Sequence, residues 1–157
     1  TRAQMYKGKA DWRPIAAVKN NPRMHIPIFG NGDVDSPERA IEMRDRYGLD
    51  GAMIGRASIG NPWFFDQVKY FFEKGTHKNP PTLKDRVAVA KRHLEMSIAW
   101  KGEVLGVLET RRHYTNYFKG IPNFKPYRTI MVTANESKEV FELLDRVVDE
   151  VEEPVWG

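Results

Sequence analysis

Two short apolar segments, each ending in glycine and separated by one expected helix, constrain the fold of this chain most. Residues 25–29 (His-Ile-Pro-Ile-Phe) precede Gly30, and residues 51–55 (Gly-Ala-Met-Ile-Gly) are small and apolar. Between them, Ser36 followed by Pro37 is typical of a helix start, with a hydroxyl cap and a proline in the first turn. A strand, a helix and a strand within about 30 residues form one βαβ unit, so we predict a parallel, right-handed strand pair.

The second half of the chain has the pattern of helices. A stiff, turn-favouring stretch at residues 79–81 (Asn-Pro-Pro) separates the halves. Thr82 and Asp85 begin one helix, Gly102 ends it, and further helices are expected over about 103–119 and from about 135. The residues predicted to face inward are Leu83, Val87, Ala90, Leu94 and Ile98, then Val104, Val107, Leu108, Thr115 and Phe118, then Val140, Leu143, Leu144, Val147, Val148 and Val151. The sequence therefore predicts an α/β domain at 1–78 and a small bundle of three helices at 79–157.

The ends of the two predicted strands form a candidate anion site. Residues 30–33 (Gly-Asn-Gly-Asp) follow the first strand, and residues 55–57 (Gly-Arg-Ala) end the second. Glycines let backbone N–H groups approach an anion closely, and an arginine can make a bidentate contact with phosphate. The loops after the seventh and eighth strands of a TIM barrel frequently form a phosphate site, and this pair matches that arrangement. Either loop taken alone is equally well explained as a simple turn.

A more specific match comes from several motifs taken in order. They are TRAQMYKGKADW at residues 1–12, IPIFGNGD at 26–33, GAMIGRA at 51–57 and GNPW at 60–63. Together they resemble the successive motifs of bacterial tRNA-dihydrouridine synthases. The resemblance implies the C-terminal part of a TIM (β/α)8 barrel, with its last two strands and their helices, followed by a helical tRNA-binding domain. It also implies that the FMN phosphate is lined by Asn31, Gly32, Asp33, Gly55 and Arg56.

The resemblance further implies a reaction. The family reduces a uridine of tRNA to dihydrouridine, NADPH reduces the flavin, and a cysteine acts as general acid. This chain contains no cysteine, so the catalytic residues are expected upstream of Thr1 and the chain alone is expected to be inactive and to hold FMN weakly. Gln4 and Tyr6 would lie at the catalytic mouth, where substrate contact and loop packing are equal alternatives. A chain without cysteine has no disulfide or thiolate metal site, and it fits a cytoplasmic protein.

A tract without acidic residues, from Thr110 to Arg128, is the third candidate feature. Basic side chains alternate in it with aromatic ones, a composition that can neutralise phosphates and stack on unpaired bases. The alternative is a solvated helix face above core aromatics. In view of the resemblance, we expect Arg111, Arg112, Lys119 and Arg128 to contact phosphates of tRNA.

Other features narrow the function classes. The net charge of +4 and the pI near 9.3 favour anionic partners only mildly. The histidines lack metal-ligand spacing and His93 is expected at the surface, so no metal is predicted, and the apolar runs are too short for a membrane span. Because an isolated two-stranded sheet is marginally stable, we expect self-association, or rearrangement of the first 80 residues, through exposed barrel surface. Two alternatives stay open: a piece of another FMN-dependent TIM-barrel oxidoreductase, or a non-catalytic helical RNA-binding module.

Overall fold

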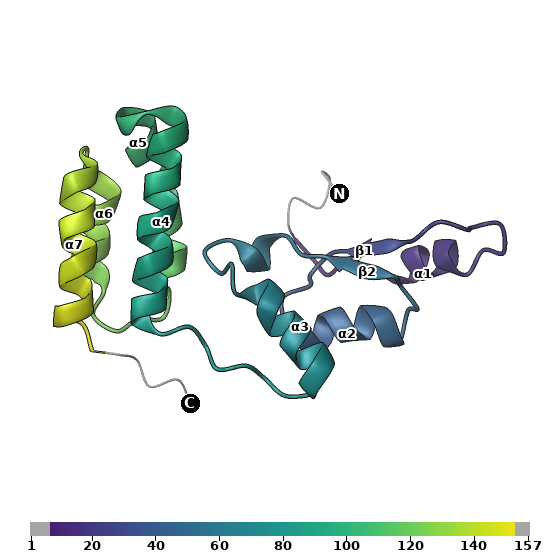
Figure 1. The fold of residues 1–157 in the computed structure, drawn as a ribbon. Coiled ribbons are helices and arrows are strands. Elements are labelled where there is room, and N and C mark those ends of the chain that lie inside the picture. Colours follow the sequence, from purple (N-terminus) through teal and green to yellow (C-terminus); the bar gives the residue numbers. More distant parts are fainter. Residues whose placement is uncertain (1–6, 153–157) are drawn as a thin grey trace. The chain divides into compact units, whose positions relative to one another are not determined.

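The structure, a computed structural model, describes residues 7–152 of the chain. The chain divides into two compact units, Thr1–Lys78 and Asn79–Gly157 (Figure 1). The described buried apolar side chains form two separate clusters, one in each unit. Each unit therefore has a core of its own.

The first unit contains a parallel pair of strands with helices packed against it. Its elements are α1 (Arg13–Lys19), β1 (Phe29–Asn31), α2 (Pro37–Asp45), β2 (Gly51–Met53), the 3-10 helix η2 (Arg56–Ser58) and α3 (Phe64–Lys74). β1 pairs with β2 in parallel, with Gly30 opposite Ala52, which confirms the predicted strand pair. α2 contacts both β2 and α3. Ser36 caps α2 as predicted, because its Oγ accepts a hydrogen bond from the Arg39 N–H at 3.3 Å.

The first strand begins later than the sequence pattern indicates. It starts at Phe29, so residues 25–28 lie outside it. Pro27 has no N–H for a strand ladder. The Ile28 N–H instead donates to Oδ2 of Asp50 at 2.7 Å, and the Asp50 N–H donates to the Ile28 carbonyl at 3.0 Å. The Ile28 N–H is therefore bound by the side chain of Asp50, 22 residues later, and not by the backbone of a neighbouring strand as the apolar run predicted.

The two faces of this small sheet differ. The side of Gly30 on which a side chain would lie faces the helices. Met43 and Leu49 pack there so closely that a Cβ at Gly30 would lie 2.5 Å from Leu49 Cδ1. Phe29 and Met53 lie on the opposite face and are 65% and 59% exposed. The core between sheet and helices consists of Trp12, Val34, Ala40, Met43, Leu49, Phe64 and Val68. The described residues thus cover one face of the strand pair and leave the other open.

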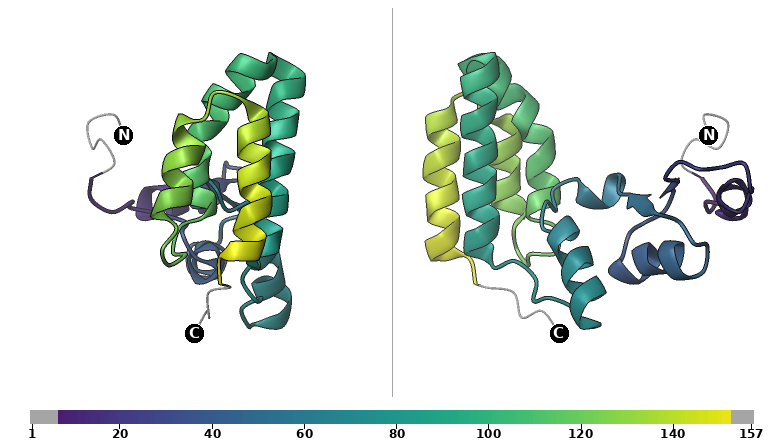
Figure 2. Two further views of the ribbon diagram at one scale, coloured as in Figure 1. Left: turned by 90° about the vertical axis from the view of Figure 1, so that its left-hand side faces the viewer. Right: turned by 45° about the vertical axis from the view of Figure 1, so that its right-hand side comes forward.

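The second unit consists, in its described part, of four helices around one core. They are α4 (Leu83–Lys101), α5 (Glu103–Tyr117), α6 (Lys125–Thr133) and α7 (Ser137–Glu150). Contacts join α4 to α5, α5 to α6, α6 to α7 and α7 back to α4, so each helix touches two others (Figure 2). The sequence predicted only three helices and missed α6. Pro126 lies in the first turn of α6, where the missing N–H costs nothing.

The inner face of α4 was predicted correctly. Leu83, Val87, Ala90 and Leu94 are buried, and Ile98 packs partly buried against the same core. The predicted cap is also present: Thr82 Oγ1 accepts from the Asp85 N–H at 3.1 Å, and Asp85 Oδ2 accepts from the Thr82 N–H at 2.9 Å. For α7, Val140, Leu143, Leu144 and Val147 are buried as predicted.

The predicted inner face of α5 was largely wrong. Val107 and Phe118 are buried, but Val104, Leu108 and Thr115 are exposed. The face that meets the core carries Gly106, Val107, Thr110, Tyr114 and Tyr117. The reason is the close approach of α4, because a Cβ at Gly106 would lie 2.7 Å from the Ile98 Cα and 2.8 Å from its backbone N. Only a glycine allows the two backbones to meet there, and that requirement turns the exposed aliphatic residues outward.

Candidate functional site

The two loops predicted to hold an anion lie at one edge of the strand pair. Asn31 is the last residue of β1 and pairs with Met53, the last residue of β2. Gly32 and Asp33 follow the first strand, and Gly55 precedes η2, which begins at Arg56. Because the strands are parallel, their carboxyl ends point the same way, and ligands bind outside such ends in open α/β sheets.

The Asp33 carboxylate joins three separate parts of the chain. Its Oδ1 accepts from Arg56 Nη2 at 2.9 Å, and its Oδ2 accepts from the Ala10 N–H at 2.7 Å. Asp33 also has a positive φ of 49°, which is uncommon for a residue with a side chain. The Asp33 side chain is 25% exposed and that of Arg56 is 61% exposed, so the ion pair orients the guanidinium more than it stabilises the fold.

Residues 10–12 lie against the first of these loops. The Trp12 Nε1–H donates to the Gly32 carbonyl at 2.9 Å. Gly32 has a φ of 124°, and a Cβ there would lie 2.5 Å from the Ala10 Cβ, so this position requires glycine. Around Gly55, by contrast, no atom lies within 4 Å of an added Cβ. The side of Gly55 on which a Cβ would lie therefore faces open space, whereas its carbonyl accepts from the Ser58 N–H at 3.0 Å and from Ser58 Oγ at 2.8 Å.

The structure thus brings Asp33 and Arg56 into contact, with Gly32 and Gly55 in the same loops and an exposed Asn31 at the strand end. Ala10 and Trp12 complete this edge and were not assigned to it from the sequence. They lie 20 or more residues before their hydrogen-bond partners, and no local sequence pattern predicts a contact over that separation. Gln4 and Tyr6 lie outside the described residues.

The four cations predicted to bind RNA have different surroundings. Arg111 is directed at the end of α6: its Nε donates to the Ala134 carbonyl at 2.9 Å, and its Nη2 donates to the Thr133 carbonyl at 3.0 Å and to Asn135 Oδ1 at 2.8 Å. This guanidinium satisfies carbonyls that a helix C-terminus leaves without partners. Arg112 is exposed, and its Nε approaches His113 Nε2 at 3.3 Å.

Lys119 and Arg128 lie with Lys125 around one hollow, which we call the basic hollow. It has a volume of about 590 Å³, and its other lining residues are Thr115, Asn116, Phe118, Gly120, Ile121, Asn123 and Phe124. None of these residues is acidic. Within residues 7–152, no carboxylate pairs with Lys119, Lys125 or Arg128, whereas many other cations of the chain are paired. Arg86 fixes the wall of the hollow, because its Nη1 donates to the carbonyls of Tyr117 at 3.0 Å and Lys119 at 3.3 Å.

The prediction that His93 lies at the surface was wrong. It is half-buried between α4 and α5, its ring centroid is 4.8 Å from that of His113, and its Nδ1 lies 3.0 Å from the Tyr117 hydroxyl. Burial, with a smaller effect of the Arg112 and Lys101 charges, lowers the pKa of His93 below its usual range. Burial is also the main cause that lowers the pKa of His113. Both rings are therefore neutral at pH 7 and add nothing to the positive charge beside them.

Among residues 7–152, no group of three or more histidine and acidic side chains is placed to hold a metal ion. No helix in the same part of the chain combines the length and the apolar character needed to cross a membrane.

Comparison with known proteins decides the family. The family described as "Dihydrouridine synthase (Dus)" matches residues 1–152. The chain belongs to the dihydrouridine synthase family. A probable tRNA-dihydrouridine synthase 1 of Synechocystis sp. is 35% identical over 148 residues, which make up 94% of this chain and 41% of that protein. The tRNA-dihydrouridine synthase B of Pseudomonas putida is 37% identical over 128 residues, 82% of this chain and 37% of that protein.

A probable tRNA-dihydrouridine synthase of Rickettsia conorii is 33% identical over 142 residues, 90% of this chain and 42% of that protein. The chain thus spans about two fifths of the length of these relatives. The family resemblance drawn from the motifs is confirmed, and the matched residues include the Asp33–Arg56 edge as well as the basic hollow.

Proposed function

We propose that this chain is part of an FMN-dependent tRNA-dihydrouridine synthase, which reduces uridine in tRNA to 5,6-dihydrouridine with NADPH as the reductant of the flavin. The observation that carries the proposal is the Asp33–Arg56 contact at the carboxyl ends of two parallel strands, in a chain matched by the dihydrouridine synthase family. The names of the relatives favour this reaction over that of another FMN-dependent oxidoreductase. The strand edge itself argues against an RNA-binding module without catalytic function.

The strand edge has the features that the phosphate of FMN would need. Arg56 offers a guanidinium held by Asp33, and Gly55 leaves open space where a Cβ would lie. Both Asp33 oxygens already accept hydrogen bonds, so the carboxylate acts as a fixed support for Arg56. We propose that Asn31, Gly32, Asp33, Gly55 and Arg56 hold the phosphate end of FMN, which when bound supplies the hydride. A cysteine that protonates the base would have to come from elsewhere in the intact protein, because this chain has none.

Replacing Arg56 with alanine in the intact enzyme should weaken FMN binding by roughly 1.5–3 kcal/mol, the range for a hydrogen bond to a charged group. The FMN dissociation constant, measured by quenching of flavin fluorescence, tests this. Arg23→Ala, which removes an exposed cation outside the strand edge, should leave the constant unchanged. An unchanged constant for Arg56→Ala would remove Arg56 from the site.

We propose further that the helical unit binds tRNA through phosphate contacts of Arg112, Lys119 and Arg128. The support is the basic hollow, in which cations gather without an acidic neighbour in the lining. Such contacts position the RNA and carry little sequence information. The sequence prediction also included Arg111, but its donors are directed at the end of α6, so we assign it a structural role.

The dependence of tRNA binding on salt tests the basic hollow. Each phosphate contact that is lost should flatten the slope of log K against log salt by roughly 0.7–0.9, so Lys119→Ala and Arg128→Ala should each show that change. Lys138→Ala, an exposed lysine of α7 paired with Glu142, is the matched control and should keep the wild-type slope. If both hollow variants also keep it, the basic hollow does not bind phosphate.

A further inference from the structure

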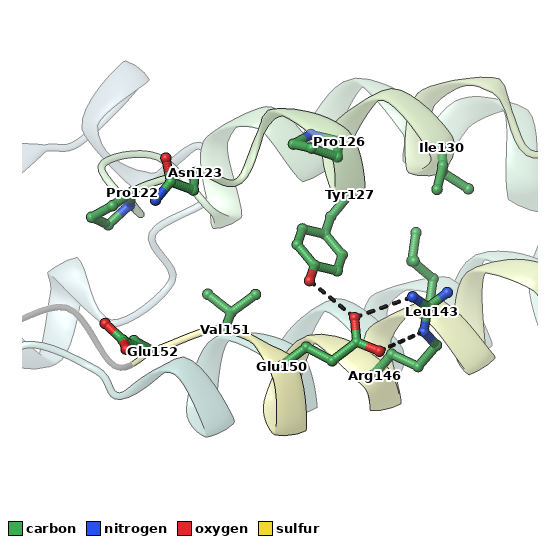
Figure 3. Close-up of a pocket in the computed structure, with 10 residues that line it drawn as sticks. All are labelled: Pro122, Asn123, Pro126, Tyr127, Ile130, Leu143, Arg146, Glu150, Val151 and Glu152. Atoms are coloured by element: carbon green, nitrogen blue, oxygen red, sulfur yellow. Dashed lines mark hydrogen bonds and ion pairs between the residues drawn. The ribbon is translucent and has the colours of Figure 1, made fainter.

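The loop between α5 and α6 separates the basic hollow from a second one. The second hollow, which we call the tyrosine hollow, has a volume of about 730 Å³ and lies between α6 and the end of α7 (Figure 3). Asn123 lines both hollows. It has a φ of 56°, an uncommon conformation for a residue with a side chain, and such strained positions cluster at functional sites.

The tyrosine hollow presents a fixed aromatic ring. Tyr127 extends from α6 toward α7, where its hydroxyl donates to Glu150 Oε2 at 3.0 Å (Figure 3). Arg146 holds the same carboxylate, with its Nε 2.9 Å from Glu150 Oε1 and its Nη2 3.1 Å from Oε2. The ring is thus anchored at its far end, and stacking on it requires little further loss of side-chain entropy.

The rest of the lining suits a flat, mainly apolar group. Pro126 and Val151 line the hollow beside the Tyr127 ring, and Pro122 and Asn123 line it from the loop between α5 and α6 (Figure 3). The lining also carries two carboxylates: Glu150, whose charge is paired with Arg146, and Glu152 at the end of the described chain.

We propose that this loop and its two hollows bind one unpaired nucleotide of RNA, with the phosphate in the basic hollow and the base stacked on Tyr127. The proposal rests on the RNA-binding role proposed above and adds a base subsite to it. Charge complementarity favours a nucleotide over an apolar peptide, because Lys119, Lys125 and Arg128 line the neighbouring basic hollow and no acidic residue lines it with them. The base must be unpaired, since proteins contact the rings of RNA bases where the bases are unstacked.

Two oligomers of equal charge distinguish the contribution of the base to binding from that of the phosphate. One is a short oligouridylate, and the other is an abasic ribose-phosphate chain of the same length. The wild-type chain should bind oligouridylate about tenfold more tightly, within the range of base stacking on an aromatic side chain. Tyr127→Leu should bind both oligomers with the wild-type affinity for the abasic one and keep the salt slope, whereas Tyr127→Phe, which retains the ring, should keep most of the difference.

The matched control is Trp100→Leu, because Trp100 is 81% exposed in the same unit and lines neither hollow. It should leave the preference for oligouridylate unchanged. Equal binding of the two oligomers by the wild-type chain would overturn the base subsite, whatever the variants do, and so would a loss in Trp100→Leu equal to that in Tyr127→Leu. If the wild-type chain binds neither oligomer nor tRNA, the RNA-binding role fails as well. If it keeps its salt-dependent tRNA binding without a preference for the base, only the present inference fails.

Discussion

Replacing Gly106 with valine should lower the free energy of unfolding of the helical unit by about 3 kcal/mol, the upper part of the usual range for overpacking. The added Cβ would lie 2.7–2.8 Å from backbone atoms of Ile98, which cannot rotate away as a side chain can. The Gly106 carbonyl also accepts from the Thr110 and Ser97 hydroxyls at 2.7 and 3.3 Å, so a shift of α5 would disturb these bonds. The better helix propensity of valine offsets only about 0.5 kcal/mol of this loss.

Denaturant unfolding followed by circular dichroism measures this effect. Leu105→Val is the control, since it places a β-branched residue next to Gly106 at an exposed position of α5. It should change the free energy of unfolding by less than about 0.5 kcal/mol. Equal stabilities of Gly106→Val and the wild type would show that the two helices do not approach this closely in solution.

Replacing Arg111 with alanine should cost about 2–3 kcal/mol of stability, because a charged donor that satisfies several acceptors is lost. The acceptors are the Thr133 and Ala134 carbonyls and the Asn135 side chain, all at the end of α6. A positive charge at a helix C-terminus also interacts favourably with the helix dipole. Thermal and denaturant unfolding of the Arg111→Ala chain measure the loss.

The neighbouring Arg112 should behave in the opposite way. Its side chain is exposed, so Arg112→Ala should change stability by less than about 0.5 kcal/mol. In tRNA binding, however, Arg112→Ala should flatten the salt slope, whereas Arg111→Ala should not do so at a temperature where both variants are folded. If the Arg111→Ala chain has wild-type stability and a flattened salt slope for tRNA binding, Arg111 contacts phosphate, as the sequence predicted.

The parts of the fold that the sequence predicted are those in which burial follows local periodicity. The inner faces of α4 and α7 repeat apolar residues at helical spacing, and the Thr82 cap depends on residues of one turn. The face of α5 could not be predicted in this way. A glycine, a threonine and tyrosines of α5 meet the core. Which face of α5 is buried depends on the close approach of α4 at Gly106.

The candidate sites show the same difference. Asp33 and Arg56 could be placed at one edge of the sheet from the sequence, because each follows a predicted strand of one parallel pair, but their ion pair was not predicted. The hydrogen bonds of Arg111 could not be predicted, because their acceptors lie 22–24 residues later, at the end of a helix that the sequence pattern missed. The tyrosine hollow also depends on that helix, because Tyr127 of α6 faces Glu150 of α7.

In the helical unit, the first described helix, α4, also packs against the last described one, α7. α4 packs against α5, its neighbour in sequence, but also against α7, which begins only at Ser137. While the chain is being synthesised, the side of α4 meant for α7 has no partner until nearly the whole unit has been made. A nascent chain that stops before α7 would therefore expose the apolar side of α4 that α7 covers in the folded unit.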